Sequence, residues 1–106
     1  MEKNILLSSR EIETIVAAFR TFFAPEDHIW LFGSRTNSEA RGGDIDLYIE
    51  TTLIDPVLLV EKNIQFICDL QKGLGEQKID LILHRLGHSP LLPIYAMARA
   101  GGVLLA

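Results

Sequence analysis

Residues 44–50 alternate strictly between polar and apolar side chains, in the order Asp-Ile-Asp-Leu-Tyr-Ile-Glu. Because successive side chains of a β-strand point to opposite faces, this pattern predicts a strand with one core face and one polar face. Residues 78–84 alternate in the same way, with Leu81 and Leu83 on one face and Asp80 on the other. The fold must therefore contain a sheet whose apolar face is covered by other elements.

Helices are indicated before, between and after these strands. The sequence Ser-Ser-Arg-Glu at residues 8–11 has the spacing of a capping box and predicts a helix start. Asp55, followed by a proline, predicts the N-cap of a second helix that extends to about Lys72. A third helix is expected over residues 93–100, where a pair of glycines follows.

The remaining apolar segments are short, and we expect strands at residues 28–32 and 103–105. Helices and strands then alternate along one domain that spans residues 1–106. The predicted fold is of the α/β (α+β) class, with a small mixed β-sheet and helices packed mainly on one face. The polar face near the strand starts would be open to form a site.

Several side chains are given expected places in this fold. The second helix is expected to bury Val60, Ile64, Ile67 and Leu74, or their neighbours, and Cys68 is expected to pack within it. His84 is expected at the surface or at a strand edge. Tyr48 shares the face of the strand carboxylates, where it either packs or flanks a substrate.

Composition and charge exclude several classes of protein. The 106 residues are 48% hydrophobic with a formal net charge of −4, which indicates a globular domain and disfavours a direct nucleic-acid surface built from clustered Lys and Arg. No apolar run is long enough for a secretion signal or a membrane span, so a cytoplasmic location is expected. A single nucleotide is not excluded, because a metal ion and a few backbone amides can hold it.

The pair Asp44 and Asp46 is the main candidate for chemistry. Residues two apart on a strand project to the same side, with Cα atoms roughly 6.5–7 Å apart. Carboxylates at that separation can converge on hard cations, and oxygen-only ligation favours Mg²⁺. Asp80 stands at the start of another strand and becomes the third ligand if the two strands are neighbours. Glu50 is roughly 13 Å further along the strand from Asp46 and is too far to join.

The segment Gly33, Ser34 and Arg35 directly follows the apolar strand at residues 28–32. Glycine allows close approach of the backbone to a ligand, and a helix that opens there directs free N–H groups at an anion. A phosphate-binding segment facing a metal site is the arrangement that phosphoryl transfer requires. The alternatives are that this segment is a plain turn and that the aspartates only form the solvent side of their strands.

Taken together, these motifs resemble the polymerase-beta-like nucleotidyltransferase superfamily. The resemblance rests on Gly33-Ser34, nine further residues, and then Asp44-Ile45-Asp46. The short chain and the sequence Lys-Ile-Asp-Leu-Ile around Asp80 are similar to its minimal branch, the MNT proteins. Gly43 departs from that pattern, since a serine often precedes the first aspartate.

The resemblance implies an enzyme with a nucleotidyltransferase-like fold that uses two Mg²⁺ ions and ATP as nucleotide donor. Asp44, Asp46 and Asp80 would be its metal ligands, and Asp80 would also accept the proton of the attacking hydroxyl. Gly33 and Ser34 would hold the β- and γ-phosphates, and Arg35 would add a positive charge.

The resemblance further implies a partner protein. Small MNT proteins typically pair with an α-helical HEPN toxin and act as its antitoxin by transferring AMP to a tyrosine. Both a monomer and an oligomer of this chain fit the resemblance. Two other functions remain open at this stage. The chain could be a non-catalytic antitoxin or assembly subunit, or a subunit of a small-molecule nucleotidyltransferase of the aminoglycoside-modifying type.

Overall fold

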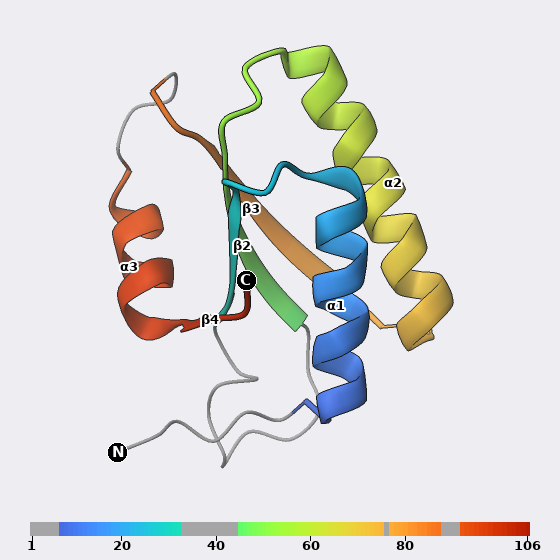
Figure 1. The fold of residues 1–106 in the computed structure, drawn as a ribbon. Helices are drawn as coiled ribbons and strands as arrows, with labels where there is room; N and C mark the ends of the chain where they lie inside the picture. The colour runs from blue at the N-terminus through green and yellow to red at the C-terminus, as the bar shows by residue number, and fades with distance from the viewer. Residues whose placement is uncertain (1–6, 33–44, 76, 88–91) are drawn as a thin grey trace.

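The computed structural model describes residues 7–32, 45–75, 77–87 and 92–106. They form a compact α/β fold of three helices and a four-stranded mixed sheet, in the order α1, β1, β2, α2, β3, α3, β4 (Figure 1). The helices are α1 (Ser9–Phe22), α2 (Pro56–Leu74) and α3 (Pro93–Gly101). The strands are β1 (His28–Phe32), β2 (Ile45–Thr51), β3 (Ile79–Arg85) and β4 (Val103–Leu104). No described helix is both long and apolar enough to cross a bilayer.

The expected helix starts are confirmed by their capping hydrogen bonds. Ser8 and Glu11 form the capping box of α1, with the Glu11 backbone N–H donating to Ser8 Oγ over 3.1 Å. The Asp55 carboxylate accepts the N–H of Val57 over 2.9 Å at the start of α2. At its other end, α2 stops at Gly75, whose positive φ of 82° is favourable only for glycine.

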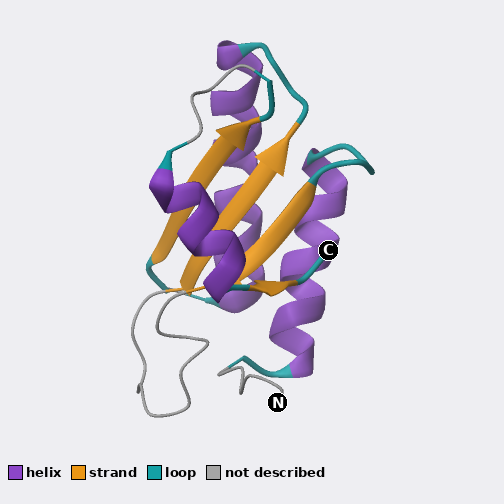
Figure 2. Ribbon diagram, turned by 90° about the vertical axis from the view of Figure 1, so that its left-hand side faces the viewer, coloured by secondary structure: helices purple, strands orange, loops and turns teal. Residues whose placement is uncertain are grey.

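The sheet has the strand order β3-β2-β1-β4. β1 is antiparallel to both β2 and β4, whereas β2 and β3 are parallel and are connected through α2. Figure 2 shows β2 and β3 running side by side in the same direction, so both strands begin at the same end of the sheet.

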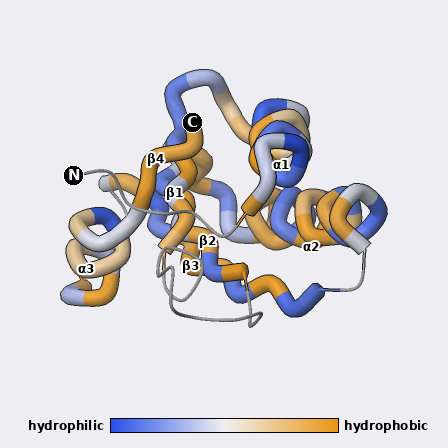
Figure 3. Tube along the Cα trace, turned by 90° about the horizontal axis from the view of Figure 1, so that it is seen from below, coloured by the Kyte–Doolittle hydropathy of each residue, from blue (hydrophilic) through white to orange (hydrophobic). Residues whose placement is uncertain are grey.

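The helices cover both faces of the sheet unequally. The main core lies between the sheet and the pair α1 and α2, and it contains Ile15, Phe19, Leu47, Ile49 and Phe66, all fully buried. A smaller cluster on the opposite face joins the sheet to α3. Figure 3 shows α1 and α2 on one side of the sheet and α3 alone on the other. Two of the three helices therefore share a face, as the sequence predicts.

The outward side of α2 differs from the expectation. Val60 and Ile64 are 57% and 58% exposed. The expected Ile67 and Leu74 do pack against the main core, beside the buried neighbours Leu59, Phe66 and Leu70. Cys68 is exposed too, so the prediction that it packs in the interior is wrong.

Asp27 joins the start of β1 to the end of β2. Its carboxylate is 1% exposed. One of its oxygens accepts the Thr51 hydroxyl over 2.7 Å, and the other accepts the Thr52 N–H over 2.9 Å. Because each acceptor oxygen is matched by a donor, this buried carboxylate is compensated by hydrogen bonds and has a structural role.

Candidate functional site

Asp46 and Asp80 lie directly opposite each other on the parallel strands β2 and β3. Neighbouring strands are about 4.8 Å apart, and partners in a ladder share one face of the sheet. Asp46 is half-buried and Asp80 is exposed. The condition on which the sequence prediction depended, that the two strands are neighbours, is confirmed.

The other predicted site residues, Asp44, Gly33, Ser34 and Arg35, lie outside the described residues. β1 ends at Phe32, which pairs with Asp46. In the described ranges no three His, Cys, Asp or Glu side chains form a group that could hold a metal ion. The described part of the site is therefore the pair of aspartates alone.

Further along the same face, a buried polar network joins β2 to β3. The Tyr48 hydroxyl donates to Glu50 Oε2 over 2.7 Å, and His84 Nδ1 lies 3.0 Å from the same phenol oxygen. Since the phenol proton is directed at Glu50, the phenol oxygen is left to accept a hydrogen bond from His84. Tyr48 is fully buried and His84 is 6% exposed. Of the two places expected for His84, the surface is wrong, but the strand edge is confirmed, since β3 stands at one end of the strand order. Tyr48 packs in the interior.

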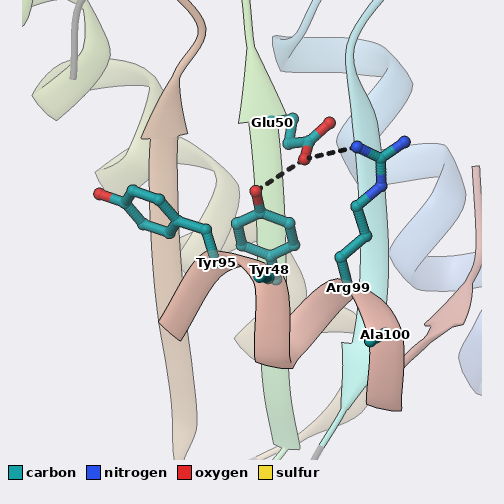
Figure 4. Close-up of a pocket in the computed structure, with 6 residues that line it drawn as sticks. Tyr48, Glu50, Tyr95, Arg99 and Ala100 are labelled. Atoms are coloured by element: carbon teal, nitrogen blue, oxygen red, sulfur yellow. Dashed lines mark hydrogen bonds and ion pairs between the residues drawn. The ribbon is translucent and has the colours of Figure 1, made fainter. Parts of the chain in front are cut away.

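Helix α3 covers this network. The rings of His84 and Tyr95 stack with centroids 4.0 Å apart and planes 9° apart. Arg99 lies 3.6 Å from Glu50 Oε2 and places its guanidinium 5.3 Å from the ring centroid of Trp30. Figure 4 shows Tyr48 behind the helix, between Tyr95 and Arg99, with Glu50 joined to both Tyr48 and Arg99. Buried Glu50 thus has a hydrogen-bond donor and a cation as partners.

A pocket of about 330 Å³ opens beside α3 over this network. Its lining consists of Tyr48, Glu50, Tyr95, Ala96, Arg99 and Ala100. Neither Asp46 nor Asp80 is among these lining residues. Glu50 stands four residues beyond Asp46 on β2, roughly 13 Å along the strand. The pocket and the aspartate pair are therefore separate features of one face.

Strand alternation does not reveal the connection within this network, although it assigns Tyr48, Glu50 and His84 to the polar faces of their own strands. The missing information was the parallel register, which sets Glu50 opposite His84. A further signal was the aromatic and basic content of the last helix, where Tyr95 and Arg99 are four residues apart and share one side.

Because of Tyr48, the free energy of unfolding is expected to depend on pH in the alkaline range. Its burial, together with the hydrogen bond and negative charge of Glu50, raises the pKa of the Tyr48 phenol well above its ordinary value. Above about pH 10 the unfolded chain therefore releases a proton that the folded chain retains, so the free energy of unfolding falls as pH rises. Below about pH 10 the phenol keeps its proton in both states, and the contribution of Tyr48 to the free energy of unfolding is fully present.

We expect Tyr48→Phe to reduce this alkaline loss by up to about 1.4 kcal/mol per pH unit, the value for one proton. Urea unfolding of wild type and variant between about pH 9 and about pH 11 measures the two slopes, in the range where tyrosine ordinarily titrates. Equal slopes would show that the Tyr48 phenol does not titrate differently in the folded and unfolded states.

Comparison of the chain with protein-family models and with curated protein sequences finds no match.

Proposed function

We propose that this chain is a Mg²⁺-dependent nucleotidyltransferase with a nucleotidyltransferase-like fold. The observation that carries the proposal is the register that sets Asp46 opposite Asp80 at the starts of two parallel strands. Two carboxylates on one face and on adjacent strands are close enough for one cation to bind both and offset their mutual repulsion. In the sequence, Asp44 stands two positions before Asp46, which is the spacing of side chains on one face of a strand.

The residues fit the metal by their chemistry. Asp44, Asp46 and Asp80 offer only oxygen ligands, which hard cations such as Mg²⁺ prefer. Two bound Mg²⁺ ions would neutralise charge on the triphosphate and acidify the attacking hydroxyl. Gly33, Ser34 and Arg35 supply the backbone N–H groups, hydroxyl and guanidinium that suit the phosphates of ATP.

The proposed reaction is in-line transfer of AMP. The acceptor hydroxyl oxygen forms a bond to the α-phosphorus, the bond from that phosphorus to the bridging oxygen breaks, and pyrophosphate leaves. Asp80 accepts the proton of the hydroxyl. Asp80 is exposed, so an acceptor approaching from outside the chain can reach it.

We further propose that the acceptor is a tyrosine of a partner HEPN protein and that this chain acts as its antitoxin. This part rests on the resemblance to MNT proteins. In the part of the chain that the structure describes, the pocket beside α3 is lined by neither Asp46 nor Asp80, and an acceptor hydroxyl supplied by another protein fits this separation. A partner that positions a hydroxyl against the α-phosphate would lower the barrier by several kcal/mol.

Nucleotide binding tests the metal site directly. We expect Asp46→Asn to weaken Mg²⁺-dependent ATP binding at least about tenfold, or about 1.4 kcal/mol, because one anionic ligand is lost. Isothermal titration calorimetry with and without EDTA measures the effect. Asp69→Asn is the matched control, since Asp69 is an exposed carboxylate on α2 away from β2 and β3. Wild-type affinity in the Asp46 variant would place the site elsewhere.

The acceptor is tested with ATP labelled in the adenosine. Incubated with Mg²⁺, this chain and the protein encoded beside it, the label is expected to become covalently attached to that neighbour at a tyrosine. Binding of Mg-ATP without any transfer would favour a non-catalytic antitoxin. Rapid modification of a small molecule by this chain alone, at about 1 s⁻¹ or more, would favour the small-molecule transferase.

A further inference from the structure

Strand β3 is an edge strand, and half of its backbone groups point away from the sheet. It stands at one end of the strand order, and no described strand lies beyond it. The Ile45 N–H donates to Lys78 O over 3.0 Å, and the Leu86 N–H donates to Thr51 O over 2.9 Å. Even-numbered residues of this segment therefore direct their backbone groups toward β2. The N–H and C=O groups of residues 79, 81, 83 and 85 point to the open edge.

Within the described residues, neither a proline nor a bulge interrupts this edge. Edge strands are commonly interrupted by proline, by a bulge or by a central charge pointing inward. The seven residues of β3 pair with β2 without a break and include the apolar run Leu81-Ile82-Leu83. Leu81 and Leu83 are only half-buried, whereas Leu47 and Ile49, their partners on β2, are fully buried. The core is thus incomplete on the side of β3.

The exposed apolar side chains of α2 border the same edge. Gln71 donates from Nε2 to the carbonyl oxygen of Gln77, just before β3, over 2.7 Å. On a helix of 3.6 residues per turn, Val60, Ile64 and Gln71 lie within about 40° of one another. The flank of α2 that carries Val60 and Ile64 is therefore the one that faces the β3 edge, and both side chains are more than half exposed.

We propose that this edge is the docking surface for a second copy of the same chain, with the two β3 strands paired antiparallel about a two-fold axis. An axis perpendicular to the sheet at Ile82 aligns all seven residues of both strands. Leu81 of one copy then lies opposite Leu83 of the other, as a hydrogen-bonded pair of the ladder. Asp80 lies opposite His84 of the other copy, so no two like charges meet.

Self-complementarity is the reason to expect a second copy rather than an unrelated strand. In this pairing the apolar run Leu81-Ile82-Leu83 of one copy faces the same run of the other, and each contact occurs twice, as in any two-fold interface. Each copy also brings Val60 and Ile64 to the seam on the α2 side. A stable interface covers about 800 Å² on each partner, roughly an eighth of the 6372 Å² surface of this chain.

Sedimentation equilibrium and amide hydrogen exchange of the full chain together test the proposal. We expect a reversible dimer in the micromolar range, together with protection of the Leu81 and Leu83 amides that increases with protein concentration. The Ile82 amide, which faces β2, should be protected in monomer and dimer alike. A monomer throughout that range, or a dimer in which the Leu81 and Leu83 amides still exchange rapidly, would overturn the proposal.

Two matched variants test whether the docking surface lies at the β3 edge. Ile64→Glu places a charge at the seam from a position that is 58% exposed, so the monomer should fold normally. We expect it to raise the dimer dissociation constant at least about tenfold. Met97→Glu makes the same kind of change on α3, at a position 68% exposed, and should leave the dimer intact. The reverse pattern would assign the interface to α3 and overturn the proposal. None of these measurements involves a nucleotide, so they stand apart from the proposed activity.

Discussion

Replacing Asp80 with asparagine is expected to slow AMP transfer at least about 100-fold, the typical effect of losing a positioned base. Asparagine keeps the size of the side chain and can still donate a lone pair to a cation, but it cannot take up the proton of the attacking hydroxyl. Asp80 lies opposite Asp46 and is exposed. The substitution should therefore leave the fold intact and confine the defect to the chemical step.

This prediction differs from a general loss of function because turnover should fall while the affinity for Mg-ATP changes little. Single-turnover transfer gives the rate of the chemical step, and calorimetry gives the affinity for Mg-ATP. Asp46→Asn is expected to weaken affinity, whereas Asp80→Asn should change affinity much less than turnover. Asp69→Asn, on the exposed side of α2, should alter neither quantity. Lost affinity with normal turnover of bound nucleotide would contradict the role assigned to Asp80.

The pair Asp46 and Asp80 could be predicted from the sequence because the periodicity of a strand is a local property of the sequence. Alternation fixes which residues of 44–50 and 78–84 share a face, and a helix between the two segments favours a parallel connection. The register, with Asp46 opposite Asp80, depends on how far α2 carries the chain back along the sheet. That distance is set by packing between elements, which no local pattern specifies.

The outward face of α2 could not be read from its sequence for a related reason. Apolar residues occur on both sides of this helix, with Leu59 and Phe66 on one side and Val60 and Ile64 on the other. Either side satisfies helical periodicity, so only the tertiary contact decides between them. Gly73 lies within α2, where an added Cβ would come within 2.5 Å of Thr14 Cγ2 on α1, and the helix ends two residues later at Gly75. Of these two glycines, the first permits close helix packing and only the second ends the helix.

Local sequence patterns could not predict the buried polar network under α3, for another reason. Glu50 and His84 are polar residues on a strand face that periodicity assigns to solvent. They are buried because α3 folds back over that face and brings Tyr95 and Arg99 to them. Such a cover is favourable only when hydrogen bonds and a cation compensate the buried groups, and this condition involves residues from three separate elements.

Phe66→Ala is expected to cause the largest loss of stability, about 4 kcal/mol of unfolding free energy. Phe66 is fully buried on α2 and meets Phe19 and Phe23 edge to face, with ring centroids 6.4 Å and 5.7 Å apart. These contacts hold α2 against α1 at the centre of the main core. Alanine would leave a cavity there, and the stacked pair Phe19 and Phe23 cannot close it without breaking its own contact at 5.2 Å.

Urea denaturation measures this loss as a lower transition midpoint at an unchanged slope. Domains of this size are stabilised by about 5–15 kcal/mol, so the variant should keep only about 1 kcal/mol of unfolding free energy if the wild type lies near the lower limit. Val57→Ala is the matched control on the same helix, since Val57 is 66% exposed and lies away from the core. It should change the unfolding free energy by less than about 0.5 kcal/mol. Similar losses in the two variants would mean that α2 does not dock through Phe66. The parallel placement of Asp46 and Asp80, which depends on that docking, would then lose its structural basis.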